Sequence, residues 1–540
     1  MKINLNQKVT DNSIFFLSLF IIILILSPIF TIFLENINQK SDYLSFFSSG
    51  EFQSYTKNSI IILIPVLFFT LFLGGLSSYL VSFYEFTGVN FFKYSLLLSF
   101  AIPPYIYAYT LSAFFENFGI AYSLTSFFSE DLSRKFIPKI EPLTGSIISL
   151  SLTLFGYVFI LTRSTFLNQS RDLIEIGKSL GFNNFDIFFK IIIPTARPAI
   201  FIGLSLVAME TLSDFGTVSF FGISTFTTGI YNSWFIFDDL KTANFLSLFL
   251  VFFVLFFFGL ENLSRKNIKF FNSNNSFNKK NKKTLLRGYK SFLASFFCFF
   301  LFSISFLFPL ILMLKWSLVN SSFLDLDQIL HLNYNSVKLI FLSSIFIISI
   351  SLIVTFSGRV LKSRALSFFS NLSISGYAIP GIVVSVSIIS LFSLIDSFFN
   401  VEIRGYFIGS IFGLIFGYTV RFYSISFNTI KTVYLKINKS IDESALLLGF
   451  NKFSILKNVH YPLLKKNLIF AFILISIEVI KELPITLILR PFNFDTFSTS
   501  AFNLASNDLV EVAAIPSLFI VLWSSLFIFL SIKFFLIDKK

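Results

Sequence analysis

The chain reads Glu175-Ile-Gly-Lys-Ser-Leu-Gly181-Phe-Asn and then Ile191-Ile-Ile-Pro194, and this stretch returns as Glu443-Ser-Ala-Leu-Leu-Leu-Gly449-Phe-Asn and then Val459-His-Tyr-Pro462. In both copies Glu precedes Gly by six residues, and Gly precedes Pro by thirteen. We expect a short helix carrying the Glu, a sharp turn at the Gly, where positive φ is accessible, and a second short helix that the Pro ends. Two such rigid projections suit two copies of one partner.

The composition around these loops is that of a membrane protein. Of 540 residues, 55% are hydrophobic and only 13% are charged, against roughly 25% charged in soluble domains. This excludes an ordinary soluble enzyme and a disordered chain. The single cysteine, Cys298, and the two histidines, His331 and His460, exclude a disulfide scaffold and a Cys/His zinc or haem site.

Runs of about 20 apolar residues predict transmembrane helices, and we expect an all-α polytopic protein with twelve of them. No cleavable signal peptide is expected, because the first apolar run is too long for one. The first six spans are Ile14–Leu34, Ser59–Phe83, Tyr94–Phe115, Leu143–Leu161, Ala199–Phe221 and Phe245–Leu260. The second six are Ser291–Leu314, Ser336–Phe356, Phe368–Ile395, Tyr406–Ser426, Asn467–Leu489 and Val512–Phe535.

The formal charge of +13 is explained by orientation rather than by nucleic acid. With the N-terminus inside, most of the 42 Lys and Arg residues fall on the cytoplasmic side, and only Lys338 and Lys481 are assigned to spans. Cytoplasmic loops of membrane proteins carry this excess of positive charge. We therefore expect both termini in the cytoplasm, the lipid bilayer as the surroundings, and no nucleic-acid partner.

The two halves of the chain predict a tandem repeat. Asn58-Ser59 returns as Asn335-Ser336 and Ala101-Ile-Pro103 as Ala378-Ile-Pro380, each with an offset of 277, whereas the loops have an offset of 268. The difference falls in an outside loop that is longer in the first half, Glu116–Pro142. Six spans per half give a parallel repeat about an axis along the membrane normal.

We therefore divide the chain into three parts. Residues 1–260 form the first repeat, with the loop 163–198, and residues 291–540 form the second repeat, with the loop 427–466. Between them, residues 261–290 form a basic cytoplasmic linker with nine Lys or Arg residues and one acid. A repeat of this kind predicts a pathway at the interface between the halves.

The first loop contains Gly177-Lys178-Ser179, which looks like the end of a phosphate-binding loop. Such a loop needs a glycine five residues before Gly177 and a preceding strand. That position is Asp172, and the surroundings are helical. We expect no ATP site in this chain.

The two loops resemble the EAA loop of ABC-importer permeases, which reads Glu-Ala-Ala, three residues, Gly, nine residues and Ile-x-Leu-Pro. The copies depart from it as Glu-Ile-Gly with Ile-Ile-Ile-Pro and as Glu-Ser-Ala with Val-His-Tyr-Pro, while Glu, Gly and Pro hold in both. The resemblance implies a type I importer fold, with each loop docking as a coupling helix on a separate ATPase subunit, two copies in all. It assigns ATPase coupling to Glu175, Gly181, Pro194, Glu443, Gly449 and Pro462.

The spans that follow the loops carry acids at matched positions. Glu210 and Asp214 lie four residues apart, as do Glu478 and Glu482, so that each pair shares a helix face. A charge at mid-bilayer costs about 2.5–3.5 kcal/mol, so we expect these four acids to have a functional or a structural role that offsets this cost. One reading is a pathway lined by carboxylate oxygens, which suit a hard cation. The other is structural, with Glu478 paired to Lys481 or the acids bonded across the repeat interface.

Three stretches resemble the fused iron(III) importer permeases: Ala101–Tyr109, Glu210–Val218 and, most specifically, Lys481–Thr496. This resemblance covers nearly the whole chain. It implies ferric-iron uptake across the bacterial inner membrane by alternating access, with a periplasmic binding protein delivering the substrate. Arg490 and Asp495 would meet that protein at the outer mouth, or are plain solvated loop charges. We expect no stably bound cofactor and no catalytic residue, and ATP bound only by the partner subunit.

Other functions stay open on the sequence alone. Fused permeases for thiamine or phosphonates share both loops, and the acids favour a cation over a phosphonate anion without excluding thiamine. An ion-gradient-driven secondary transporter would explain the repeat and the acids, but not the two loops. A membrane enzyme lacks a catalytic cluster, and both histidines are expected on water-exposed segments.

Overall fold

The computed structural model is a bundle of membrane-length helices, and it describes residues 2–37, 50–116, 119–126, 139–169, 171–266, 283–323, 325–361 and 363–534. In the N-terminal half the α-helices are α1 (Lys2–Ile37), α3 (Gly50–Phe83), α4 (Val89–Ser95), α5 (Pro104–Phe115), α6 (Ile120–Ser126), α8 (Pro142–Asn168), α9 (Arg171–Ser179), α10 (Asn184–Ile187), α11 (Ile193–Ser213), α12 (Gly216–Phe220), α13 (Phe226–Tyr231) and α14 (Leu240–Lys266).

In the C-terminal half they are α15 (Tyr289–Phe302), α16 (Phe308–Val319), α17 (Leu326–Leu361), α18 (Arg364–Ser373), α19 (Gly381–Phe399), α20 (Arg404–Phe407), α21 (Ile411–Tyr434), α22 (Ser440–Leu447), α23 (Lys452–Ile455), α24 (Tyr461–Lys481), α25 (Pro484–Leu489), α26 (Phe497–Ser506) and α27 (Val510–Ile532). The 3-10 helices are η1 (Leu96–Ala101), η5 (Ser321–Phe323) and η6 (Ile374–Ala378), and the π-helical turns are η2 (Phe188–Ile192), η3 (Asn232–Ile236), η4 (Ser303–Leu307) and η7 (Leu456–His460).

The protein is an all-helical polytopic membrane protein. Within the described residues, nine helices are long and apolar enough to cross a membrane, or ten if the bent pair Val89–Ala101 and Pro104–Ser123 is one span. Helices α21 and α24, where the tenth and eleventh spans were expected, are 24 and 21 residues long and carry charges such as Arg421 and Lys481, and neither is among these nine. The count of twelve stays a prediction.

Four of the expected spans are broken rather than continuous. Two break at Pro103 and Pro380, where a 3-10 turn ends and a new α-helix begins, because proline supplies no N–H to continue the first helix. The other two break after α11 and α24, at Asp214 and Glu482, which both take an extended backbone. These breaks place the acids of the site.

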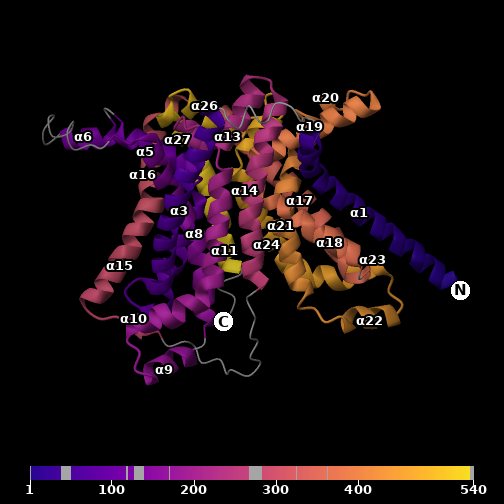
Figure 1. Ribbon diagram of the computed structural model, residues 1–540, viewed down its shortest axis with the longest axis horizontal. Helices are drawn as coiled ribbons and strands as arrows, with labels where there is room; N and C mark the ends of the chain where they lie inside the picture. Colours follow the sequence, from indigo (N-terminus) through magenta and orange to yellow (C-terminus); the bar gives the residue numbers. More distant parts are fainter. Residues whose placement is uncertain are drawn as a thin grey trace.

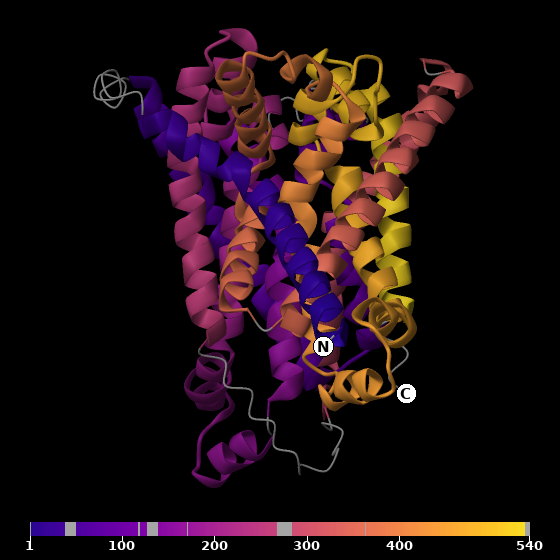
Figure 2. The same cartoon turned by 90° about the vertical axis from the view of Figure 1, so that its right-hand side faces the viewer.

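The first helix of each half packs against the other half. Helix α1 lies on α17, α18 and α19, and Figure 2 shows it crossing that face obliquely. Helix α15 lies on α3, α4 and η1, while α16 contacts α5 as well as α27. The loop helices α9 and α22 lie at one end of the molecule, and α13 and α26 lie at the other (Figure 1).

The end of the basic linker is fixed to the first half. Residues β2 (Thr284–Leu285) pair in parallel with β1 (Tyr84–Glu85), and Lys283 Nζ donates to the carbonyl of Val81 at 2.6 Å. Burial, with the nearby Lys93 and Arg163, lowers the pKa of Lys283 to about 8. Residues 261–266 of the linker belong to α14, whereas residues 267–282 and most of the long outside loop, residues 117–118 and 127–138, lie outside the described residues.

Candidate functional site

Both loops turn at their glycine with the same backbone geometry. Gly181 has φ +81° and Gly449 has φ +85°, which confirms the expected left-handed turn. The N–H of Phe182 donates to the carbonyl of Gly177 and that of Phe450 to the carbonyl of Ala445, which makes each turn a Schellman motif. Glu175 and Glu443 lie exposed on the helices before these turns, α9 and α22.

The loop prolines do not end the second short helix, contrary to the prediction. Pro194 and Pro462 lie in the first turn of α11 and α24, which continue directly from the π-helical turns η2 and η7. A proline within a helix clashes with the carbonyl four residues earlier and lacks its own N–H. The wider π turn accommodates this, so each loop runs into its span without a break.

The second loop is held by a polar network that sequence reasoning missed. Arg359 Nε donates to Asp442 at 2.6 Å, and its other nitrogens donate to the carbonyls of Tyr434, Ile437 and Asn438. His460 Nε2 lies 2.9 Å from the other oxygen of Asp442. His460 is fully buried, so its expected place on a water-exposed segment is wrong, whereas His331 is exposed.

The first loop is held differently, by apolar contacts. Phe166, Ile187, Ile192 and Ala196 form a buried apolar cluster beside it. At the offset of 268, Phe166 corresponds to Tyr434 and Ile192 to His460. The two loops share their turns but not their anchors.

Changing Asp442 to asparagine is expected to lower the free energy of unfolding by about 1.5–3 kcal/mol, the usual loss of a hydrogen bond to a charged group. Burial alone would raise the pKa of Asp442, but the bonds from Arg359 and His460 lower it below 3.8. The carboxylate therefore stabilises the fold above pH 3.8, and this contribution is lost as pH falls through the lowered pKa. Thermal unfolding in detergent measures it.

A matched control comes from the other loop. Asp186 pairs with Lys190 on an exposed helix surface, so Asp186→Asn should change stability by less than about 0.5 kcal/mol. Equal losses in the two variants would contradict the anchoring role of Asp442.

The buried acids meet in one cavity of about 100 Å³ between the halves. Its walls come from the breaks at Pro103, Asp214 and Glu482, and from α8 and α21. The lining residues include Pro103, Tyr105, Thr153, Tyr157, Glu210, Asp214, Arg421, Glu478, Lys481, Glu482 and Pro484. Interrupted helices at matching positions of two halves are typical of substrate sites in transporters.

The two acids at the breaks have similar surroundings. The carboxylate of Asp214 accepts from the N–H groups of Thr217 and Val218, and its carbonyl accepts from the Thr227 hydroxyl at 2.7 Å. The carbonyl of Glu482 accepts from the Ser498 hydroxyl at 3.0 Å. Both hydroxyls lie within a threonine capping box, which spans Thr225–Thr228 in one case and Thr496–Thr499 in the other. Polar side chains thus satisfy backbone groups that the helix breaks leave unpaired.

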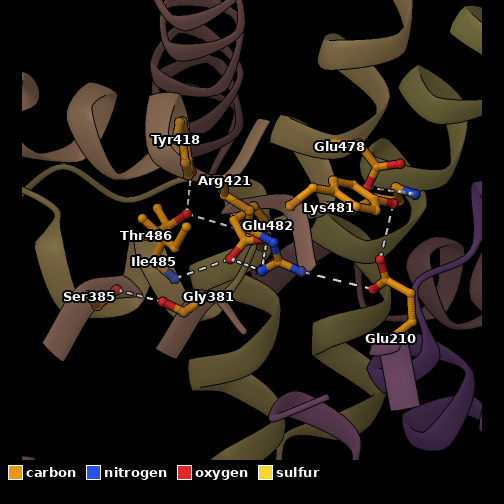
Figure 3. Close-up of polar contacts among 12 residues, drawn as sticks. Glu210, Gly381, Ser385, Tyr418, Arg421, Glu478, Lys481, Glu482, Ile485 and Thr486 are labelled. Atoms are coloured by element: carbon orange, nitrogen blue, oxygen red, sulfur yellow. Dashed lines mark hydrogen bonds and ion pairs between the residues drawn. The ribbon is translucent and has the colours of Figure 1, made fainter. Parts of the chain in front are cut away.

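The other acids are partnered by cations and a phenol. Arg421 Nη1 donates to both oxygens of Glu482 at 2.8 and 2.9 Å, and Arg421 Nη2 lies 3.9 Å from Glu210. Lys481 Nζ lies 3.7 Å from Glu478 on the same helix, and the hydroxyl of Tyr377 donates to Glu210 at 3.2 Å. Figure 3 shows Arg421 between the two glutamates.

The geometry therefore contains features expected of a cation pathway and features expected of a structural role for the acids. The expected Glu478–Lys481 pair and bonds across the interface between the halves are present, yet Glu210 and Glu478 keep 23% and 25% of their side-chain surface exposed, against 6% for Glu482. No three acids, histidines or cysteines come together as a metal site in the described residues. Whether the acids line a pathway stays a prediction.

Sequence reasoning missed Arg421, because only Lys338 and Lys481 were assigned to spans. The signal was available, because Arg421 lies within the apolar run Tyr406–Ser426 and arginine is costly at that depth. Tyr377 gave no signal of its own, since its role depends on a contact with Glu210 from the other half.

At the opposite end from the loops, Arg490 and Asp495 form an ion pair with each other. Arg490 also donates to the Thr499 hydroxyl at 3.2 Å in α26. The two residues are thus bonded within the loop between α25 and α26, and their role at the outer mouth stays a prediction.

A comparison with curated proteins finds a relative along almost the whole chain. The Fe(3+)-transport system permease protein FbpB 2 of Haemophilus influenzae is 23% identical over 482 residues, which cover 88% of this chain and 89% of that protein. The chain is a distant homologue of ABC-importer permeases.

Sulfate permeases match a shorter part of this permease. The probable cysT proteins of Chlorella vulgaris and Prototheca wickerhamii are 26% and 27% identical over 145 and 156 residues, and CysT of Escherichia coli is 24% identical over 147 residues. These alignments cover 27–29% of this chain and 50–58% of those proteins. No family model and no solved structure matches.

Permease subunits of ABC importers carry no ATPase domain, and this permease is a transport subunit rather than an enzyme. Its Gly177-Lys178-Ser179 lies in the last turn of α9, not in a loop after a strand. A Cβ on Gly177 would meet the side chain of Ile191 at 2.6 Å. This glycine therefore serves helix packing rather than phosphate binding.

Proposed function

We propose that this permease carries ferric iron through the bacterial inner membrane by alternating access, driven by ATP hydrolysis on a partner. The observation that carries this proposal is the cavity where two broken spans, one from each half, present four carboxylates. Carboxylate oxygens are hard ligands that suit a hard cation such as Fe³⁺. The homologous iron permease, aligned over most of both chains, supports the same substrate.

The partners follow from the two ends of the molecule. The loops with α9 and α22 lie at one end and would each dock on one copy of an ATPase subunit in the cytoplasm. The end with α13, α26 and the Arg490–Asp495 pair would receive a periplasmic binding protein. Both termini would then be cytoplasmic, in accord with the basic linker on that side.

Radioactive ferric-iron uptake tests the proposal in cells that express the permease with its ATPase and binding-protein partners. We expect ATP-dependent accumulation that is lost when the permease is omitted. Absence of iron uptake from cells that contain folded permease would overturn the iron assignment, and thiamine or phosphonate uptake would then be measured in the same cells.

Sulfate is the second candidate, because Arg421 and Lys481 bring two cations into the cavity and sulfate permeases match part of the chain. Four acids against two cations leave the cavity with a formal charge of −2, which disfavours a divalent anion. Uptake of radioactive sulfate by the same cells would identify sulfate, rather than ferric iron, as the substrate.

A further inference from the structure

Arg421 places its guanidinium in the cavity, where it forms ion pairs with acids from both halves of the chain. It extends from α21 of the second half to Glu482 in its own half and to Glu210 in the first half. The side chain is only 10% exposed. A charge so deep in a membrane protein is costly and marks a functional position.

Its two contacts are unequal. Nη1 is within 2.9 Å of both oxygens of Glu482, whereas Nη2 stays 3.9 Å from Glu210, beyond hydrogen-bond distance. Nε is buried and has no hydrogen-bond partner among the residues that the structure describes. The guanidinium is therefore held firmly on the Glu482 side and loosely on the Glu210 side.

The Glu482 side is fixed by close packing. A Cβ on Gly381 would lie 2.4 Å from Glu482 Oε1 and 2.5 Å from Arg421 Nη1. Glu482 Oε1 also accepts from the N–H of Ile485 at 3.3 Å. The pair thus has a fitted place against the start of α19, and the movable contact is the one to Glu210.

The first half has no cation of its own at the matching positions. At the offset of 268, Arg421 corresponds to Thr153 and Lys481 to Ser213, and both of these also line the cavity. Glu210 therefore takes its positive charge from the other half or from a cation that enters the cavity.

We propose that Arg421 is an internal counter-cation that holds Glu210 while the cavity is empty, and that the transported cation displaces it from Glu210. This rests on the proposed cation transport. While Arg421 bridges Glu210 and Glu482, it links the two halves; when a cation takes Glu210, the link opens and Arg421 stays on Glu482. The guanidinium also competes with the cation, so that binding stays weak enough for release.

The link itself is tested without substrate, on the full chain in detergent. Glu210→Gln is expected to lower the unfolding temperature by about 2 °C in the parent, and to have no further effect in an Arg421→Gln background. Equal effects in both backgrounds would overturn the link, whatever the substrate is.

The displacement is tested in the complex with ATPase and binding protein, using the variant Arg421→Gln with Glu482→Gln. This change removes one charge of each sign, so the cavity keeps its formal charge, and Glu482 is not left behind without the guanidinium that bonds it. With gallium(III) citrate as a probe that cannot be reduced, we expect at least tenfold more metal retained on the purified complex, and at least tenfold slower iron uptake.

Lys431→Gln is the matched control, because Lys431 lies on the same helix and pairs with Asn371 away from the cavity. It should retain no metal and transport at the parental rate. Parental uptake and no metal retention in the Arg421/Glu482 variant would overturn the displacement. If the parent itself takes up no iron, the proposed substrate fails, while the unfolding experiment still decides whether Arg421 links the halves.

Discussion

Replacing Gly449 with proline is expected to abolish ATP-driven uptake while leaving the permease in the membrane. Gly449 has φ +85° between α22 and α23, and proline fixes φ near −65°. The strain amounts to about 3 kcal/mol or more. This energy shifts the equilibrium roughly a hundredfold from the native turn toward a disrupted one. The α22 helix would then point in a new direction, away from its ATPase groove. Gly181→Pro should act in the same way, since φ there is +81°.

Asparagine provides the control for this prediction. No atom of the described part of the chain lies within 4 Å of a Cβ placed on Gly181 or Gly449, so a side chain has room there and the positive φ is what limits a substitution. Asparagine tolerates the left-handed region better than other residues with a side chain. Gly449→Asn should therefore keep most of the uptake that Gly449→Pro loses. Uptake of radioactive iron and permease content of the membrane are measured together, and full uptake by both proline variants would contradict the coupling role.

The loops were predictable because their geometry is local. A glycine six residues after a helical glutamate and thirteen before a proline requires a turn, and both turns have positive φ. The same reasoning failed for Pro194 and Pro462, because a proline ends a helix only if the backbone cannot widen. The π turns η2 and η7 supply that extra room, and no residue pattern in the loops marked them.

The cavity was predictable only in part. Helical spacing placed the acids in pairs, since four residues return to the same face, and the sequence indicated the Glu478–Lys481 pair. It did not indicate that Glu210 would meet Tyr377 and Arg421 from the other half. Such contacts depend on how helices pack, which no local spacing specifies. The buried network around His460 was missed for the same reason, because Arg359, Asp442 and His460 come from three separate segments.

The second large effect is expected from Glu210→Gln combined with Glu478→Gln. These two acids keep about a quarter of their side-chain surface exposed, whereas Glu482 is closed in by Arg421 and the carboxylate of Asp214 is bonded to backbone N–H groups of α12. Glu210 and Glu478 are therefore the carboxylates that an entering cation can reach. The double change raises the formal charge of the cavity from −2 to zero.

Each carboxylate that loses its charge is expected to reduce uptake by about 10–100-fold, because a bond to a charged group contributes about 1.5–3 kcal/mol. Glutamine keeps the size and the accepting oxygen, so Tyr377 can still donate to residue 210 and the fold should be retained. Uptake of radioactive iron is compared at equal membrane content, with the stimulation of ATP hydrolysis by the loaded binding protein as a second reading. A pathway role requires that uptake falls while this stimulation persists, since the loops are untouched.

Asp214→Asn separates this role from a structural one. The side-chain oxygen of asparagine can still accept from the backbone of α12, so the helix break is kept, and Asp214 offers little free oxygen to a cation. We expect uptake within a few-fold of the parent, far above that of the double variant. If the Glu210/Glu478 variant transports at the parental rate, these carboxylates serve only to join helices, and the cation passes elsewhere. If Asp214→Asn loses uptake as fully as the double variant, the break itself is the sensitive feature rather than the two reachable carboxylates.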